Sequence, residues 1–168
     1  MDSLENEQST DTDYKKLSNE ISEILITLGK IIEKADLIFV WRNYYNEEKS
    51  SSLLYKEQIF EWNRKNKTKD CSIITNKLEE VIVPPELEEA LTKDLPVFTL
   101  VSEMTDVYSQ SLLEENNVKA VLMVSIFVAG KLYGCLSLDN CSTDENFNND
   151  EINIVKKFGD RLGKLLEK

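Results

Sequence analysis

The chain has 168 residues, of which 41% are hydrophobic and 30% are charged, and this is the composition of one soluble globular domain. Its net charge of −11 argues against a nucleic-acid partner, because DNA- and RNA-binding surfaces need positive charge to displace counterions from phosphates. No apolar run reaches the roughly 20 residues that span a bilayer, and no signal peptide opens the chain. We therefore expect a cytoplasmic protein that does not contact a membrane.

The chain contains no histidine and three cysteines. The lack of histidine excludes a catalytic triad, a histidine general base and a histidine-ligated zinc or haem within this chain. In a cytoplasmic protein the cysteines are expected to be thiols rather than disulfides. The composition therefore predicts neither a catalytic set nor a metal site.

The first part of the chain predicts a tail, a helix and two strands. Residues 1–13 hold five acids and no base, which predicts a disordered acidic tail, and residues 14–168 are expected to form the domain. Apolar residues recur at three- and four-residue steps over 14–34, which predicts a helix. Residues 37–43 and 53–62 are rich in β-branched and aromatic side chains and predict an antiparallel pair of strands around a polar loop at 46–52.

The middle and the end of the chain predict three helices and a strand besides a hairpin. Residues 63–76 are polar and predict a loop. Pro85 stands in the first turn of a short helix predicted over residues 85–93, and a strand over 97–101 and a helix over 108–116 follow. Residues 150–168 carry one apolar stripe and predict the last helix.

The most informative stretch is 119–139, in which two β-rich runs joined by Ala129-Gly130 predict a hairpin. The first run is apolar on both faces, so we expect it to lie centrally in a sheet. In the second run one face is apolar, with a glycine that would let a helix approach: Leu132, Gly134, Leu136 and Leu138. The opposite face is more polar: Tyr133, Cys135, Ser137 and Asp139.

The polar face of the hairpin and one face of the second strand hold the candidate ligand-binding residues. In the second strand, alternation places three of them together: Gln58, Phe60 and Trp62. The split between apolar and polar faces predicts helices under one side of the sheet and a small-molecule pocket on the other. Two alternatives stay open, because aromatic residues on a strand face also form core, and Asp139 can equally cap the turn after the hairpin.

Three stretches of the chain resemble a known family. Residues 35–41 (ADLIFVW) are similar to its helix-to-strand junction, and residues 58–62 (QIFEW) to its second strand. The most specific stretch is 112–154, where LLEENNVKAVLMVSIFVAGKLYGCLSLDN is followed by Phe147 and by Asp150-Glu151-Ile152. In their order and spacing, from Lys16 to the last residue, these motifs resemble a GAF domain, similar to the GAF modules of sensor histidine kinases.

The resemblance implies an α/β (α+β) fold, with an antiparallel sheet, N- and C-terminal helices on one face and a ligand pocket on the other. It implies a regulatory module of signal transduction that senses a small molecule. The terminal helices would form a homodimer and pass the signal to a partner or a fused output domain. The ligand and any cofactor remain unknown at this point.

The chain departs from the motifs of the better-known ligand-binding members. The Asn-Lys pair expected before Phe147 in cyclic-nucleotide-binding members is missing. Photoreceptor members attach a bilin through a cysteine that is usually followed by histidine, which this chain lacks. A haem would have only a cysteine thiolate as its protein ligand. None of these three ligands is therefore expected.

One enzyme is known on this fold, the free methionine sulfoxide reductase, which uses up to three cysteines. A catalytic thiol needs exposure and a lowered pKa. Cys135 lies within a strand and Cys141 lies beside Asp139 and Asp144, so only Cys71, after the basic residues 64–69, has a neighbourhood that favours a thiolate. We expect no enzyme, and keep this reductase and a ligand-free dimerisation module as the alternatives.

Overall fold

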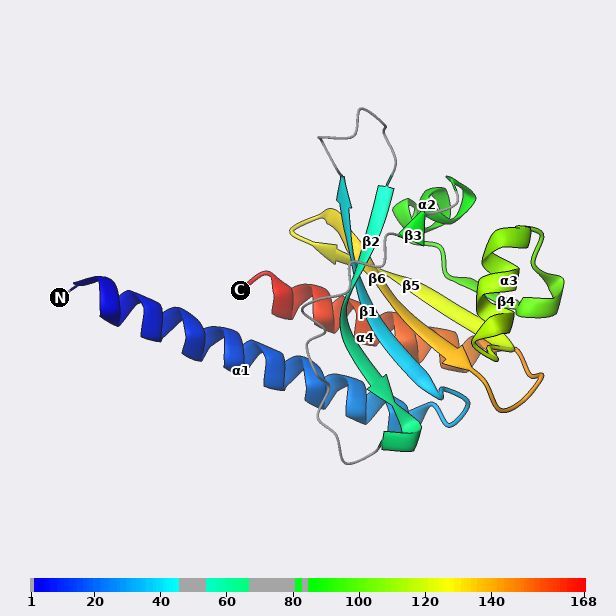
Figure 1. The fold of residues 1–168 in the computed structure, drawn as a ribbon, viewed down its shortest axis with the longest axis horizontal. Helices are drawn as coiled ribbons and strands as arrows, with labels where there is room; N and C mark the ends of the chain where they lie inside the picture. Colours follow the sequence, from blue (N-terminus) through cyan, green and yellow to red (C-terminus); the bar gives the residue numbers. More distant parts are fainter. Residues whose placement is uncertain (1, 46–53, 67–80, 83–84) are drawn as a thin grey trace.

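The computed structural model describes residues 2–45, 54–66, 81–82 and 85–168. The predicted loop at 46–52, most of the predicted loop at 63–76 and Cys71 lie outside the described residues. The described chain forms a six-stranded sheet in the order β3-β2-β1-β6-β5-β4, and every neighbouring pair is antiparallel (Figure 1). The strands are β1 (Leu37–Tyr45), β2 (Leu54–Asn63), β3 (Val81–Ile82), β4 (Val97–Leu100), β5 (Ala120–Val128) and β6 (Lys131–Asn140).

Helices cover the two faces of this sheet unequally. The long terminal helices, α1 (Asp2–Ile31) and α4 (Asn149–Leu166), lie together on one face, which we call the helix side (Figure 1). The opposite face, the far face, carries the short helix α2 (Pro85–Thr92) over β5 and β6. Helix α3 (Val107–Glu115) packs on the 3-10 turn η2 (Val101–Glu103) after β4. The predicted α+β architecture, with both terminal helices on one face, is confirmed.

The helix α1 begins earlier than the sequence predicts. It starts at Asp2, so the segment predicted to be a disordered tail continues the helix, and its first turns project beyond the sheet (Figure 1). No glycine or proline occurs between Asp2 and Leu28, so nothing in the sequence stops a helix that the later residues have nucleated. Among the described residues, no helix combines the length and the apolar character needed to cross a membrane.

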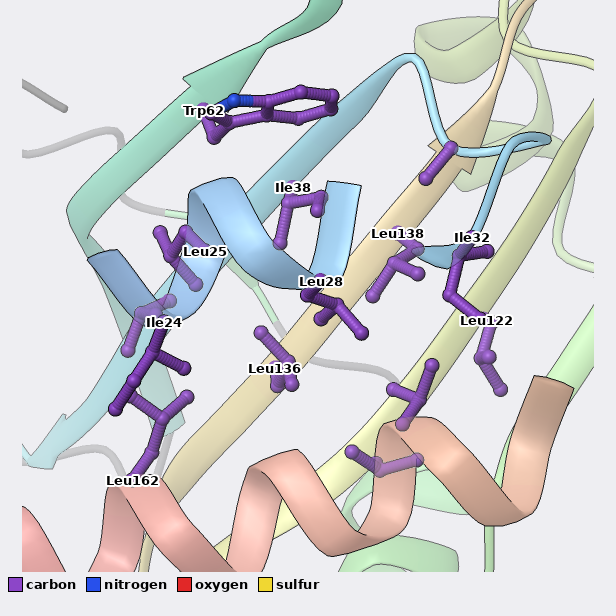
Figure 2. Close-up of a cluster of buried hydrophobic side chains, with 14 of the residues drawn as sticks. Ile24, Leu25, Leu28, Ile32, Ile38, Trp62, Leu122, Leu136, Leu138 and Leu162 are labelled. Atoms are coloured by element: carbon purple, nitrogen blue, oxygen red, sulfur yellow. The ribbon is translucent and has the colours of Figure 1, made fainter. Parts of the chain in front are cut away.

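The main hydrophobic core lies between the helix side of the sheet and the two terminal helices (Figure 2). Apolar residues at helical spacing in α1 and α4 meet alternate residues of β1, β5 and β6. The residues drawn and labelled in Figure 2 include Leu25, Leu28, Ile38, Leu122, Leu136, Leu138 and Leu162. Burial of each such side chain contributes about 1.5–3 kcal/mol, so this layer supplies most of the stability of the fold.

Two glycines of α4 bring that helix unusually close to β5. A Cβ on Gly163 would overlap the Phe127 carbonyl, and one on Gly159 would lie 3.0 Å from the Ser125 carbonyl oxygen. The prediction that Gly134 admits a helix is wrong, because a Cβ there would overlap the Trp41 carbonyl of β1. Gly134 therefore permits a close approach of two strands, and the glycines that admit a helix lie on the helix itself.

Arg64 closes the C-terminal end of α1. Its guanidinium donates hydrogen bonds to the carbonyl oxygens of Gly29, Ile32 and Ala35 and lies 5.0 Å from the centre of the Trp62 ring. The last carbonyls of a helix have no partners within the helix, and a cation there also complements the helix dipole. Arg64, the first of the basic residues 64–69, thus has a structural role in α1.

Candidate functional site

A β-bulge in β2 separates the three candidates of that strand. Val40 pairs with Phe60 and the next residue, Trp41, pairs with Gln58, so Ile59 is the extra residue. Phe60 and Trp62 lie in the helix-side core, whereas Gln58 lies on the far face and donates a hydrogen bond to Glu61. The expectation that the three share a face is wrong, because one extra residue reverses every side chain beyond it.

A second bulge, in β6, moves Tyr133. Ile126 pairs with Gly134 and Phe127 with Leu132, which leaves Tyr133 as the extra residue. Its ring packs against the helix-side core, so the prediction that it shares a face with Cys135 is wrong. Burial raises the pKa of the Tyr133 hydroxyl, an effect that Arg42 partly opposes and that Glu57 and Tyr14 reinforce. Tyr14 belongs to α1, which agrees with the helix-side position.

The other three hairpin candidates stay together on the far face and are buried there. The exposed fractions are 0% for Cys135, 2% for Ser137 and 8% for Asp139. Two residues of the neighbouring strands join them: Asn43 of β1 and Lys56 of β2. We call this set, Asn43, Lys56, Cys135, Ser137 and Asp139, the polar row. Buried polar side chains are costly unless they have partners, so the partners of each one are informative.

The middle of the polar row is held by Trp41. Its ring Nε1–H donates a 2.8 Å hydrogen bond to the Ser137 hydroxyl oxygen, and the ring packs against Phe39 at a centroid distance of 5.7 Å. Because the serine oxygen accepts this bond, the hydroxyl proton of Ser137 can still be donated to another group. Sequence reasoning missed Trp41 as a site residue, although it follows Phe39 by two positions and so shares its face by simple alternation.

Asp139 occupies one end of the polar row. It lies opposite Leu37 and Val121 in register, and no described residue donates a hydrogen bond to its carboxyl oxygens. Burial raises the pKa of this carboxyl to about 7, well above its ordinary value. At neutral pH the group is therefore close to half protonated and can either accept or donate a hydrogen bond. The cap of the following turn is instead Asp36, which accepts hydrogen bonds from the Cys141 amide and the Ser142 hydroxyl.

Lys56 occupies the other end of the row. Its side chain is 4% exposed, and its Nζ lies 3.1 Å from the Cys135 sulfur. In the described part of the chain no carboxylate forms an ion pair with it. Beside it in register, the side-chain oxygen of Asn43 is buried and has no hydrogen-bond partner. Sequence reasoning missed both residues. Lys56 shares the face of Gln58 by alternation, but a charged residue in a strand ordinarily indicates a solvent-facing position.

Of the two described cysteines, Cys135 is buried although Lys56 Nζ contacts its sulfur, and Cys141 has a raised pKa. Cys135 lies on the far face of the sheet and is fully buried. Burial, with smaller contributions from the Asp139 and Asp36 carboxylates, raises the pKa of the Cys141 thiol to about 11 against an opposing effect of Lys65. A thiol with this pKa is protonated at neutral pH, and the thiolate is the nucleophile. Cys71, the third cysteine, lies outside the described residues.

The far face is partly covered by α2. The Ser125 hydroxyl donates a 2.6 Å hydrogen bond to the Leu91 carbonyl oxygen, and Leu91 is itself buried. A smaller apolar cluster of Val101, Val118 and Val121 lies nearer to α3. The polar row therefore lies on a face that α2 covers at one side.

Two grooves outside the polar row are evident among the described residues. One, of about 310 Å³, lies between α1 and α4 and is lined by acidic, apolar and basic residues: Glu20, Glu23, Ile24, Arg161, Lys164, Leu165 and Lys168. The other, of about 270 Å³, lies beside Val101 and Lys119. Neither groove is lined by a predicted ligand-binding residue. No cluster of three or more carboxylate or thiol side chains that could hold a metal ion occurs in the described ranges.

The sheet, its terminal helices and the buried polar row define an α+β domain with one face packed for stability and another bearing polar groups. The chain belongs to the GAF domain family, whose sequence model matches residues 36–166. The resemblance recognised in the hairpin and the strands before it is thereby confirmed. No match to a curated protein was found.

Solved structures share this fold at low sequence identity. The GAF domain region of a protein from Geobacter sulfurreducens PCA has a TM-score of 0.65 and 18% identity, covering 95% of this chain and 98% of that chain. The phycoerythrobilin-bound GAF domain of a cyanobacterial phytochrome has a TM-score of 0.70 and 14% identity, with coverages of 96% and 91%. The blue-light-absorbing form of the PixJ GAF domain from Thermosynechococcus elongatus has a TM-score of 0.65 and 13% identity, with coverages of 93% and 88%.

Proposed function

We propose that this GAF domain is a cytoplasmic sensory module of signal transduction that binds a small molecule on the far face of its sheet. The observation that carries the proposal is the polar row, above all the buried Asp139 carboxyl without a described partner. A fold gains nothing from burying such groups without partners, whereas a binding site needs them to orient a ligand. Several of the similar GAF structures are photoreceptors, one of them with phycoerythrobilin bound, and this supports a sensory role.

The ligand contacts in this proposal come from Gln58, Cys135, Ser137 and Asp139 of the predicted set. Asn43, Lys56 and Trp41 join them from the same face. The other three predicted residues lie in the helix-side core: Phe60, Trp62 and Tyr133. In this proposal they do not contact the ligand and affect its binding only through the position of the strands. A ligand that favours one arrangement of β1, β2 and β6 would bias the helices packed beneath them.

We further propose a homodimer formed through the terminal helices. On α1, Tyr14 is 53% exposed, and Ile31 near the end of the helix is also exposed. The groove between α1 and α4 has acidic residues on one wall and basic residues on the other, so a second copy related by a twofold axis can match charges of opposite sign. Size-exclusion chromatography with light scattering should give twice the monomer mass, and a strict monomer at high concentration would remove this part of the proposal.

The proposed domain is not an enzyme. The buried position of Cys135 and the raised pKa of Cys141 both argue against thiol catalysis at those two residues. The test is turnover of free methionine sulfoxide by the wild type and by the three single cysteine-to-serine variants. We expect no turnover above background. Turnover that is lost in Cys71→Ser would establish the reductase instead.

The direct test of ligand binding is native mass spectrometry of the protein as purified. The expected spectrum contains a species heavier than the polypeptide by the mass of one small molecule, which is lost on collisional activation. Asp139→Asn is the diagnostic variant, because it changes one far-face group with little change in size, and it should retain less of the molecule. Asp160→Asn, on the exposed surface of α4, is the matched control. A spectrum without any added mass, together with a far face filled by the protein's own side chains, would favour the ligand-free dimerisation module.

A further inference from the structure

Helix α3 turns apolar side chains toward solvent. The helix lies at the end of the molecule opposite the start of α1 (Figure 1), and over its whole described length it has no buried residue. Its inner side faces η2, where the Gln110 side chain donates a 2.9 Å hydrogen bond to the Val101 carbonyl oxygen and Leu113 packs on the smaller apolar cluster. A surface helix of a globular protein ordinarily turns its apolar stripe toward the core.

Three apolar residues lie on the opposite side of the helix, which we call the outer face of α3. Val107 is 72% exposed, Tyr108 65% and Leu112 38%. Tyr108 and Leu112 are four residues apart and are therefore neighbours on the helix surface. Of the seven exposed large hydrophobic side chains among the described residues, five lie between residues 95 and 112. Single exposed apolar residues are ordinary, whereas a group of them marks an interaction surface.

Acidic residues accompany these apolar side chains. Residues 101–118 contain four acids and no base: Glu103, Asp106, Glu114 and Glu115. Asp106 caps the start of α3, where negative charge is favourable. Glu114 and Glu115 lie two helical turns after Val107 and Tyr108, so they share the outer face. They also lie at the C-terminal end, where the helix dipole disfavours negative charge. A positively charged partner would offset that cost.

A groove of about 270 Å³ continues this surface past the end of α3. Its lining comes from α3, from the chain on either side of it and from the loop after β6: Leu100, Val101, Ser102, Glu114, Val118, Lys119 and Asp144. The Lys119 ammonium lies 3.8 Å from the Asp144 carboxylate. Two carboxylates therefore face one ammonium, and the groove has room for a side chain and a net negative charge.

We propose that the outer face of α3 is a docking surface for a basic segment of another protein that also carries apolar side chains. Its apolar residues would cover Tyr108 and Leu112, and its lysines or arginines would lie beside Glu114 and Glu115. A second copy of this chain at the same face would bring like charges together, and nucleic acids and anionic lipids are repelled for the same reason. The face is small, so the complex belongs to the weak, transient class.

The probe is a synthetic amphipathic peptide about four helical turns long, with leucines on one side and lysines on the other. Fluorescence anisotropy of the labelled peptide, titrated with the full chain at physiological ionic strength, should show saturable binding. The same peptide with glutamate in place of lysine should not bind. The peptide with serine in place of leucine should bind about tenfold more weakly. Equal binding of the lysine peptides with and without leucine would overturn the apolar part of the surface.

Variants of the chain locate the site. Tyr108→Ser and Leu112→Ser should each weaken binding of the leucine–lysine peptide about tenfold. Glu114→Gln and Glu115→Gln should weaken it less and make it less sensitive to salt. All four changed side chains are exposed, so the melting temperature should stay at the wild-type value and a loss of binding cannot be ascribed to unfolding.

Two matched controls change exposed groups of the same types elsewhere. Tyr14→Ser, on α1, and Glu33→Gln, just after it, should leave the affinity unchanged. Controls that weaken binding as much as the α3 variants would overturn the proposal, because binding would then follow net charge alone. A dimer that dissociates in Tyr108→Ser, measured by light scattering, would overturn it too, since the face would then belong to a second copy. None of these outcomes depends on a small molecule on the far face, so the inference and the proposed function can fail separately.

Discussion

The two faces of strand β6 differ although they belong to the same ten residues. Leu136 and Leu138 lie on the helix side and are completely buried among other apolar side chains. Ser137 and Asp139, which alternate with them, are almost as deeply buried but are polar. The two faces are thus equally buried but differ in chemistry. The helix side is an apolar core, whereas the far face buries polar groups, which costs stability unless they have partners.

The largest effect is expected on the helix side. Leu138→Ala removes a fully buried side chain from the core drawn in Figure 2 and leaves a cavity between β6 and α1. Such substitutions cost about 2–5 kcal/mol, and we expect a value near the middle of this range. Urea unfolding of the variant gives the change in free energy. A loss below about 1 kcal/mol would contradict the division between the two faces.

The next largest effect is a pH dependence on the far face. The folded pKa of Asp139, about 7, lies above the unfolded value, so its contribution to stability is complete in acid and is lost as the pH rises through 7. Between about pH 5 and pH 8 the ligand-free protein should lose about 2–3 kcal/mol of stability at this one residue. In Asp139→Asn that loss should be absent. Identical pH profiles in urea unfolding would refute the buried, unpartnered carboxyl.

An intermediate effect is expected where α4 approaches β5. Gly163→Ala places a Cβ against the Phe127 carbonyl, so the helix must shift away from the sheet. Overpacking of this kind costs about 1–3 kcal/mol. Asp160→Ala, on the exposed surface of the same helix, is the control and should change stability by less than about 0.5 kcal/mol. Thermal unfolding of both variants measures the difference, and equal melting temperatures would mean that α4 packs less closely than described.

The smallest effect is expected within the polar row. Ser137→Ala removes the acceptor of the Trp41 ring N–H and should cost about 1 kcal/mol in the protein without ligand. The same variant should lose more ligand affinity than stability, because the hydroxyl is expected to contact the ligand. Native mass spectrometry and urea unfolding of one preparation compare the two losses. Normal ligand retention together with lower stability would assign Ser137 to the fold alone.

The sequence predicts the architecture well because hydrophobic periodicity encodes it. Alternation in the hairpin and the stripes of the terminal helices place Leu136, Leu138 and Leu162 correctly in the helix-side core. The site is predicted less well because two β-bulges, at Ile59 and Tyr133, reverse the faces of the residues beyond them. A bulge is one extra residue whose position depends on the partner strand, so alternation within one strand does not reveal it.

The same limitation explains the residues that were missed. Lys56 is a charged residue in a strand, a pattern that ordinarily indicates a solvent-facing position. Only the pairing of β2 with β1, and of β1 with β6, brings its ammonium to Cys135. The composition of residues 1–13 predicts disorder. However, the segment contains no glycine or proline, so nothing in it prevents the helix that follows from extending back through it.

The chain's two tryptophans allow the central comparison to be measured directly, because Trp41 lies on the far face and Trp62 in the helix-side core. Trp62→Phe leaves only Trp41 to report, and Trp41→Phe leaves only Trp62. The measurement is the fluorescence emission of each variant as purified, and again after unfolding, dialysis and refolding to remove any bound small molecule. We predict a changed Trp41 emission and an unchanged Trp62 emission. An unchanged Trp41, or a change confined to Trp62, would contradict a ligand site on the far face.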